Sequence, residues 1–364
     1  MLKAPHTAGL IGEATTISAR KSLLSSHASS EGVAPVNALR APDLAQRAGF
    51  AEGFGKRAFL TVDVEEEFDW SAPFSREGHT LSTISHLERF QRFCEEIGAH
   101  PVYLLDWPVA GDPRAIEIIG DALSRGRADI GAQLHAWVNP PFCEDLSNKN
   151  SFAGNLPPEL ERAKFVALRD HIAAVFGRKP LIFRSGRYGL GPNTAAMLRE
   201  EGVRIDTSVR SLFDYSAQDG PDFSDFPAHP YWLDPDRSLL ELPLTSLYWG
   251  PLRHQGRHVH RLQRFIPNFF AGFSRFGLLE RLALTPEGVT AEEAIRCVDQ
   301  ALSDGLEMMV LSFHSPSLAP GFTPYCASEA DVEALYDWFA RIYGHFDKRG
   351  VQSARLCDVL QAAR

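Results

Sequence analysis

The sequence contains no CxxC pair, and its five cysteines are scattered along the chain: Cys94, Cys143, Cys297, Cys326 and Cys357. Thiolate zinc sites need paired cysteines, and disulfide-stapled domains need an even, closely spaced set, so both classes are disfavoured. We expect the cysteines to be reduced, which favours a cytoplasmic location.

Long apolar runs and runs of a single charge are also missing. No stretch approaches the roughly twenty apolar residues that cross a bilayer, so no transmembrane segment is predicted. The chain carries 37 basic and 46 acidic residues, a net charge of −9, and neither sign forms a long run. These features argue against an extended interface with nucleic acid.

What the sequence does have is enough apolar material for a large core. Its 364 residues are 44% hydrophobic and 10% aromatic, which suits one barrel-sized domain or two smaller ones in a soluble protein. Residues 1–55 are different, because they are rich in Ala, Ser and Gly and lack a compact apolar segment. We expect a flexible, disordered N-terminal extension over residues 1–55 and a folded domain over residues 56–364.

Short β-rich runs alternate with helical segments from Arg57 onward, which is typical of parallel βα units and predicts an α/β fold. The strand candidates are residues 57–64, 100–106, 128–135, 180–186, 203–209, 239–245 and 308–314. Helices are expected over residues 81–97, 157–176, 193–201, 290–303 and 328–346. Residues 246–288, basic and aromatic, fit this pattern poorly and are expected to form an insertion or a lid.

The stretch TVDVEEEFDW, residues 61–70, puts five acidic side chains directly after an apolar strand. In a parallel α/β barrel, catalytic side chains come from the C-terminal ends of strands and the loops that follow. Polar residues stand at this position in several units: Asp63, Glu65, Asp106, Gln133, His135, Arg184 and His314. Their recurrence at one relative position predicts a functional site at that end of the sheet.

Strand geometry suggests that some of these residues bind a metal. Asp63 and Glu65 are two positions apart and therefore share a face of their strand, as Gln133, His135 and Trp137 do on another. Asp63, Glu65 and His135 are candidate ligands of a divalent cation, with zinc as the expected metal.

Structural roles remain open for residues of these types. A carboxylate at a strand end, such as Asp106, can cap a helix, and Arg184 can close a buried ion pair. His135 and Trp137 can each be plain core residues. The metal hypothesis depends on these side chains converging in space.

Five segments resemble, in order and spacing, the motifs of the polysaccharide deacetylase, or NodB-homology, family, and look closest to its WalW-like branch. The segments are TVDVEEEFDW (61–70), DIGAQLHAWVNPPF (129–142), FRSGRYG (183–189), LLELPLT (239–245) and LSFHSPSL (311–318). The resemblance spans about residues 57–357.

This resemblance implies a distorted (β/α)₇ barrel that removes N- or O-acetyl groups from glycans with a bound divalent metal. It implies that Asp63 is the general base, that Arg184 orients this base, and that His314 is the general acid. Backbone N–H groups near Tyr188 or Gly189 are expected to stabilise the oxyanion.

Two departures from the family pattern affect the metal site. A second aspartate usually follows the first one, but this sequence has Val64 there, and Glu65 is the nearest substitute. The paired histidines of the family correspond to Gln133 and Trp137, with His135 between them. The expected metal ligands are therefore Glu65, His135 and Asp63.

Aromatic residues near the motifs are candidates for stacking on sugar rings: Trp107, Trp137, Tyr188 and Trp249. Asp106 is a further candidate for contact with the substrate. The preferred function is a metal-dependent hydrolase that releases acetyl groups from an N-acetylated poly- or oligosaccharide, a non-peptide C–N bond. Two alternatives stay open: a non-catalytic glycan-binding relative with a degenerate metal site, and an amidohydrolase acting on a small cyclic amide.

Overall fold

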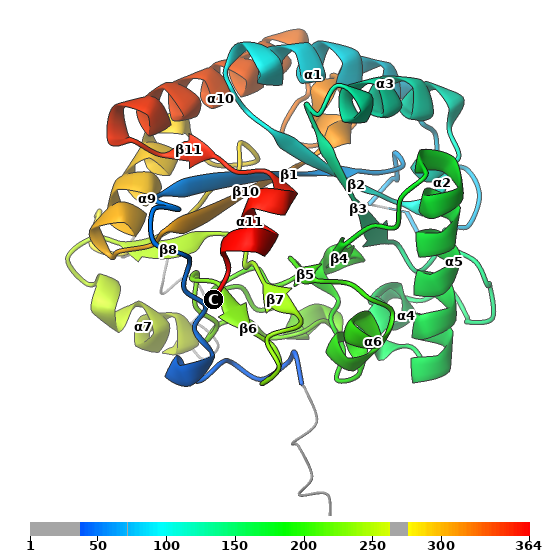
Figure 1. Ribbon diagram of the computed structural model, residues 1–364, viewed down its shortest axis with the longest axis horizontal. Coiled ribbons are helices and arrows are strands. Elements are labelled where there is room, and N and C mark those ends of the chain that lie inside the picture. Colours follow the sequence, from blue (N-terminus) through cyan, green and yellow to red (C-terminus); the bar gives the residue numbers. More distant parts are fainter. Residues whose placement is uncertain (1–36, 71, 263–275) are drawn as a thin grey trace, which may run out of the picture. The chain divides into compact units, whose positions relative to one another are not determined.

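The fold is organised around a curled sheet of mostly parallel strands, with most of the helices on its outer side (Figure 1). This computed structural model describes residues 37–70, 72–262 and 276–364.

The sheet of the described residues has nine strands, and seven of its parallel strands each fall within one of the predicted strand runs. They are β1 (Arg57–Val64), β2 (Pro101–Leu105), β3 (Asp129–Leu134), β4 (Ile182–Ser185), β5 (Ile205–Asp206), β7 (Leu240–Glu241) and β10 (Met308–His314). Their order is β10-β1-β2-β3-β4-β5-β7, and β6 (Tyr231–Trp232) lies antiparallel to β7. β11 (Gln352–Ser353) pairs with β1. The α/β fold class and its barrel-like sheet are confirmed.

The two outer parallel strands, β7 and β10, approach each other without forming a ladder. Thr245, beyond the end of β7, donates its backbone N–H to the carbonyl of Val310 at 3.1 Å. Val310 returns its own N–H to the hydroxyl of Thr245 at 2.9 Å. The backbone of Leu284 then bridges Thr245 and Ser312 through two further bonds. The barrel is therefore distorted at this point, and we call the contact between Thr245, Leu284 and β10 the seam.

The helices follow the strands as the sequence predicts, with some additions. The α-helices are α1 (Leu87–Glu96), α2 (Trp107–Ala110), α3 (Pro113–Ser124), α4 (Asn148–Ser151), α5 (Pro158–Phe176), α6 (Thr194–Glu200), α7 (Gly256–Leu262), α9 (Ala291–Ser303), α10 (Glu329–Arg349) and α11 (Leu356–Ala362). The 3-10 helices are η1 (Leu44–Gln46), η2 (Ser82–His86), η3 (Ala153–Asn155), η4 (Gly186–Tyr188), η5 (Ser216–Gln218), η6 (Arg253–Gln255) and η7 (Ser315–Leu318). Among the α-helices, α2, α3, α4 and α11 were not predicted, and α7 lies in the expected insertion.

Local sequence explains where the long helix α10 begins and ends. Ser328 accepts a hydrogen bond from the backbone of Asp331, and Asp331 bonds back to Ser328, which satisfies free donors of the first turn. Gly350 ends the helix with a φ of 66°, a conformation that glycine adopts without strain.

Alternate residues of each strand face opposite sides of the sheet. On β1, Leu60 and Val62 belong to the core beneath the outer helices, whereas Phe59 belongs to a second core inside the barrel. Residues of α11, including Leu356 and Val359, close this inner core near the beginning of the strands. Asp63 lies four residues after Phe59 and therefore on the same face of β1. It faces the barrel interior at the C-terminal end of the strand.

The expected extension over residues 1–55 needs a correction at its C-terminal part. Residues 37–55 pack against the domain: Ala48 donates its N–H to the carbonyl of Pro230 at 3.0 Å, and Ala51 donates to Ala362 at 2.7 Å. Phe54 is buried in the inner core. The few apolar residues of this segment sufficed because they cover an apolar end of the barrel. Residues 1–36 lie outside the described part.

The insertion at residues 246–288 begins and ends as a hairpin. β8 (Ser246–Trp249) pairs antiparallel with β9 (Glu280–Ala283), and η6 and α7 follow β8. Residues 263–275 lie outside the described part, so a lid over this region stays a prediction.

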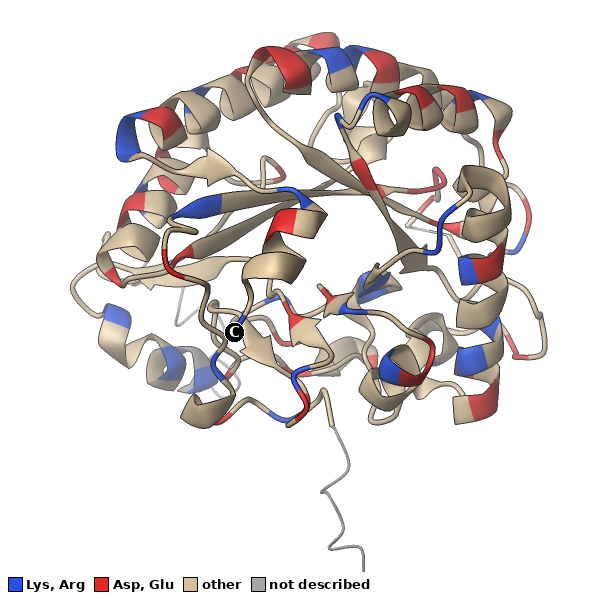
Figure 2. Ribbon diagram, in the orientation of Figure 1, with Lys and Arg blue, Asp and Glu red and all other residues tan. Residues whose placement is uncertain are grey.

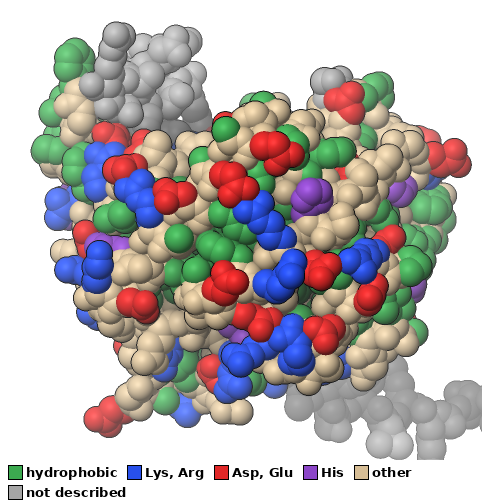
Figure 3. Space-filling model, turned by 90° about the horizontal axis from the view of Figure 1, so that it is seen from above, with side chains coloured by type: hydrophobic (Ala, Val, Ile, Leu, Met, Phe, Trp, Pro, Cys, Tyr) green, Lys and Arg blue, Asp and Glu red, His purple; other side chains and the backbone are tan. Residues whose placement is uncertain are grey.

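Charged side chains of both signs are interspersed over the outer helices (Figures 2 and 3). The face seen in Figure 3 shows acidic and basic groups side by side, with no broad field of one sign. Among the described residues, no helix combines the length and apolar character that a membrane span requires.

Gly131 of β3 tests how tightly the barrel interior is packed. A Cβ at this position would lie 2.5 Å from Leu104 Cδ2 and 2.6 Å from Ile182 Cγ2. We expect Gly131→Ala to lower the free energy of unfolding by about 1–3 kcal/mol, as overpacked cores do. Gly120→Ala on α3 is the control, because its Cβ meets nothing within 4 Å. Urea unfolding should show the control to be as stable as the parent or slightly more so. Equal stability of the two variants would contradict this packing.

Candidate active site

The strand ends converge on one pocket of about 200 Å³. Its walls are formed by Asp63, Glu65, Trp70, Gln133, His135, Phe152, Arg184, Ser185, Arg187, Tyr188, Tyr215, Gln218 and His314. Asp63 and His314 are register partners on β1 and β10, and Gln133 and Arg184 are partners on β3 and β4. Strand register thus brings together residues that are far apart in the sequence.

Asp63 is buried and forms an ion pair with Arg184. The guanidinium of Arg184 also donates to the hydroxyls of Thr61 and Ser312, each at 2.8 Å, and to the carbonyl of Thr207 at 2.9 Å. Neighbouring strands and a loop therefore hold this arginine in place. A fixed cation of this kind keeps the carboxylate of Asp63 oriented and compensates its burial.

His314 lies between two acids. Its Nε2 is 3.6 Å from Asp63 Oδ2, and its Nδ1 is 2.7 Å from Glu287 Oε2. Ser317 donates its hydroxyl to the other oxygen of Glu287 at 2.7 Å. Burial acts to lower the pKa of His314, but the charges of Glu287, Glu65 and Asp63 outweigh it and raise the pKa to about 10. The imidazole is therefore protonated at neutral pH and can act as a proton donor.

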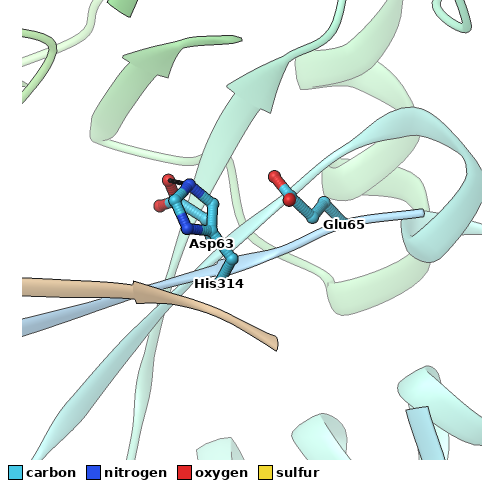
Figure 4. A group of neighbouring side chains, drawn as sticks. All are labelled: Asp63, Glu65 and His314. Atoms are coloured by element: carbon cyan, nitrogen blue, oxygen red, sulfur yellow. Dashed lines mark ion pairs between the residues drawn. The ribbon is translucent and has the colours of Figure 1, made fainter. Parts of the chain in front are cut away.

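Glu65 lies on the same side of β1 as Asp63, with the ring of His314 beside Asp63 (Figure 4). Gln133 donates an amide N–H to Glu65 Oε2 at 3.0 Å, and Nε2 of His135 lies 3.4 Å from the same oxygen. Burial raises the pKa of Glu65, and this effect is opposed by the histidines His314 and His135. The predicted sharing of a face by Asp63 and Glu65 is thus observed.

A second acidic group lies behind His135. The Nδ1 atom of His135 is 2.8 Å from Glu66 Oε2, and Trp137 donates its indole N–H to Glu66 Oε1 at 2.9 Å. Asp106 accepts the backbone N–H groups of Glu66, at 2.8 Å, and Val109, at 2.9 Å. Burial raises the pKa of Glu66 to about 7 and that of Asp106 well above its ordinary value.

Within the described part of the chain, two groups of side chains have the composition of a cation site: Asp63, Glu65 and His314, and Glu66, Asp106 and His135. The second group fits a cation poorly, because its four carboxylate oxygens already face N–H groups. Its role is to orient His135 through Nδ1, as carboxylates do for histidines that bind zinc.

The pocket side of His135 fits a cation better. Its Nε2 faces Glu65 and Gln133, and Gln133 Oε1 is buried without a hydrogen-bond partner among the described residues. Glu65, His135 and Asp63 supply the N and O donors that zinc accepts. His314 is less suited, because its Nδ1 is engaged by Glu287 and its Nε2 lies beside Asp63. A cation at this position would also compensate the burial of Glu65.

Of the predicted substrate contacts Tyr188, Trp107 and Trp249, only Tyr188 lines the pocket. Tyr188 lines the pocket, with a φ of 60°, and its ring stacks on Tyr215 at 5.5 Å between centroids. Trp107 packs on His171 instead, and Trp249 lies beside Arg296. These two tryptophans lie near the motifs in sequence, but neither lines the pocket.

Trp137 and Asp106 are also absent from the pocket walls. β3 ends at Leu134, so the two-residue alternation expected for Gln133, His135 and Trp137 does not extend to Trp137. Its ring stacks on His135 at 4.4 Å between centroids. Asp106 caps helix α2. Both support the site from behind.

Sequence reasoning missed several residues of the site. Glu287, which orients His314, lies in the loop after β9, where no strand pattern marks it. Trp70 and Arg187 lie within the quoted motifs, and the available signal was their closeness in sequence to Glu65 and Arg184. Gly189 was expected as an oxyanion donor, but its N–H donates to the carbonyl of Gly186 at 3.1 Å.

No protein-family model and no curated protein sequence match this chain. Several solved structures resemble it. A Mycobacterium smegmatis protein assigned to the polysaccharide deacetylases is 19% identical and has a TM-score of 0.49, over 91% of this chain and 94% of that one. PuuE allantoinase is 15% identical, with a TM-score of 0.49, over 85% and 91%. A family 4 acetyl xylan esterase from Clostridium thermocellum, in complex with a cobalt ion, is 12% identical, with a TM-score of 0.40, over 84% and 91%.

The solved structures that resemble the chain thus include a protein assigned to the family that the motifs suggest. The WalW-like branch stays a prediction. Function does not follow from a likeness at this level, so the chemistry must be argued from the residues of the site.

Glu287→Gln tests the origin of the raised pKa of His314. With chelator present, we expect this pKa to fall by at least about one unit, because the neighbouring charge that raises it most is removed. In the parent, the raised pKa contributes stability that is complete below the ordinary value of 6.5 and is lost as the pH rises towards about 10. The variant should therefore lose less stability over this interval. NMR titration of the His314 ring and unfolding at several pH values measure both effects.

The exposed Glu52→Gln is the matched control and should leave the titration of His314 unchanged. An unaltered pKa of His314 in Glu287→Gln would show that Glu287 does not hold the proton there.

Proposed function

We propose that this protein is a hydrolase that removes acetyl groups from an N-acetylated poly- or oligosaccharide, with a divalent cation as cofactor. The observation that carries the proposal is the pairing, at one pocket, of a carboxylate fixed by Arg184 with an imidazole held protonated by Glu287. Asp63 and His314 are thus a proton acceptor and a proton donor 3.6 Å apart.

Amide hydrolysis needs both of these groups. A water molecule must lose a proton as it attacks the acetyl carbon, and the departing nitrogen must gain one. Asp63 Oδ2 faces the pocket and can accept the proton of the water. Nε2 of His314 can donate its proton to the nitrogen as the C–N bond breaks, which releases acetate and the free amine.

Charged partners strengthen each of these roles. The ion pair with Arg184 compensates the charge of Asp63, and the contact with Glu287 prevents His314 from acting as a competing base. Among the described residues, the negative charge of Glu287 does most to raise the pKa of His314, so it favours the protonated form that a proton donor needs.

Glu65 and His135 would hold the divalent cation, with the base Asp63 next to it on the same side of β1 as Glu65. Such a cation, when bound, supplies Lewis-acid activation of the water and of the acetyl oxygen. Glu66 fixes the ring of His135 so that its Nε2 faces the pocket. Gln133 lies against both Glu65 and His135 and limits their movement.

A sugar is the substrate that best suits the pocket walls. Trp70 is 54% exposed and stands beside the acidic groups, where its ring offers an apolar face. Tyr188 and Tyr215 form a second aromatic wall. Gln218 and Arg187 also line the pocket, and their polar groups can bind hydroxyl groups.

Removal of the acid or the base should abolish activity. We expect Asp63→Asn and His314→Gln each to lower the rate of acetate release from N-acetylglucosamine oligomers by about 10²–10⁴-fold. The control is Asp347→Asn, on the exposed side of α10, which should retain the rate of the parent. If Asp63→Asn releases acetate as fast as the parent, Asp63 is not the base. If the parent shows no turnover, and a chelator leaves its affinity for the glycan unaltered, the protein is instead a glycan-binding protein.

Metal binding can be tested separately from activity. We expect elemental mass spectrometry of the parent, dialysed against trace zinc, to show about one equivalent of bound metal. Glu65→Gln and His135→Gln should each hold markedly less, because each removes a ligand. His171→Gln, beside Trp107 and outside the pocket, should bind as the parent does. Circular dichroism checks that each variant is folded, and a metal-free parent would contradict the cation site.

A further inference from the structure

A second, smaller pocket of about 50 Å³ adjoins the first. Tyr188 and His314 line both pockets, so the two share a wall at the proposed acid. The other residues of the second pocket are Arg210, Leu244, Thr245, Ser246, Ala283, Leu284, Thr285, Glu287, Ser312 and Tyr325. A water molecule occupies about 30 Å³ of liquid, so this pocket has room for a small substituent and not for a sugar ring.

Arg210 gives the second pocket its charge. No carboxylate of the described residues lies within ion-pair distance of its guanidinium, and its hydrogen bond is to the hydroxyl of Tyr215 at a long 3.4 Å. The guanidinium lies 3.9 Å from the ring centroid of Phe213 and 5.6 Å from that of Tyr188. Stacking on these rings positions the cation without neutralising it.

Further donors and acceptors of the pocket point to a ligand. The hydroxyl of Ser246 is buried and has no hydrogen-bond partner among the described residues. Glu287 is the acid of this pocket, but both of its oxygens are engaged, by His314 and Ser317. A ligand would therefore meet an unpaired hydroxyl and a cation, while the carboxylate is already compensated.

The main pocket has a similar cation in its wall. Arg187 donates to Asn148 Oδ1 at 2.9 Å and to Gln218 at 3.0 Å, and its ring contact is with Phe152 at 4.0 Å. All of these partners are neutral. Arg187 and Arg210, neither of which has a carboxylate partner among the described residues, thus line the main pocket and the second pocket.

We propose that the pocket at Arg210 binds an anionic substituent, a carboxylate or a phosphate, carried by the sugar that loses its acetyl group or by its neighbour. This proposal rests on the proposed function and defines its substrate class as an acidic glycan. Arginine offers paired N–H groups that match the oxygens of carboxylates and phosphates, and Ser246 adds a hydroxyl donor. Binding there would fix the substrate relative to His314, which lines the same pocket.

Kinetics on paired substrates test this specificity. The panel contains a neutral N-acetylglucosamine oligomer, an oligomer that alternates N-acetylglucosamine with glucuronate, and one that carries a phosphate ester. We expect Arg210→Gln to lower kcat/KM for the preferred acidic substrate about tenfold or more, and to change that for the neutral one little. Arg210→Lys should recover part of the loss. The exposed Arg204→Gln removes the same charge elsewhere and should leave both values unchanged. An equal loss on neutral and acidic substrates would overturn the proposal.

Binding of small anions provides a readout that does not need turnover. Glucuronate and inorganic phosphate are titrated into the parent, Arg210→Gln and Ser246→Ala by isothermal calorimetry, at low and high salt. We expect one of the anions to bind the parent, more weakly at high salt, and to bind Arg210→Gln at least about tenfold more weakly. Which anion binds decides between a uronic acid and a phosphorylated sugar.

The two proposals can fail separately. Anion binding that requires Arg210, in a protein that releases no acetate from any substrate, would refute the hydrolase and keep the anion pocket. Acetate release at equal rates from acidic and neutral substrates, with no binding of either anion, would refute the anion pocket and keep the hydrolase.

Discussion

The site depends on the ion pair between Arg184 and Asp63. It joins β4 to β1 inside the barrel, and the same guanidinium reaches a hydroxyl on β10 through Ser312. A buried carboxylate without such a partner would become protonated or pull water into the core. The arginine therefore has a structural and a chemical consequence, because the contact that ties the strand ends together also leaves Asp63 Oδ2 directed at the pocket and close to His314.

Beyond this pair, the pocket floor contains more negative than positive groups. Burial raises the pKa values of Glu65, Glu66 and Asp106, which means that the protein alone stabilises their charges incompletely. Glu66 and Asp106 are compensated by N–H groups that surround them. Of these three acids, Glu65 is the one that lines the pocket, together with His135. The distribution of charge thus separates a closed supporting network from an open acidic position that suits a cation.

Much of this arrangement could be predicted because strand periodicity is local. The seven strand runs and their polar ends were readable from the sequence, and register then placed Asp63 beside His314. Glu287 could not be predicted, since its contact with His314 joins an irregular loop to a strand end. The tryptophans illustrate a different limit: Trp137 is close to His135 in sequence, but the strand ends first, so its ring turns behind the histidine. Residues 37–55 looked too poor in apolar groups to fold, yet burial against an existing core requires only a few.

The seam between Thr245 and β10 has a consequence for how such a barrel can diversify. A ladder of hydrogen bonds would fix the spacing between β7 and β10. Here the contact consists of two hydrogen bonds between Thr245 and Val310 and two more through the backbone of Leu284. The hairpin β8–β9 enters at this place, and Thr245, Ser246 and Leu284 also line the pocket of Arg210. A change in this hairpin would therefore alter the lining of the pocket of Arg210, while the ion pair between Arg184 and Asp63 would keep its partners on β4 and β1.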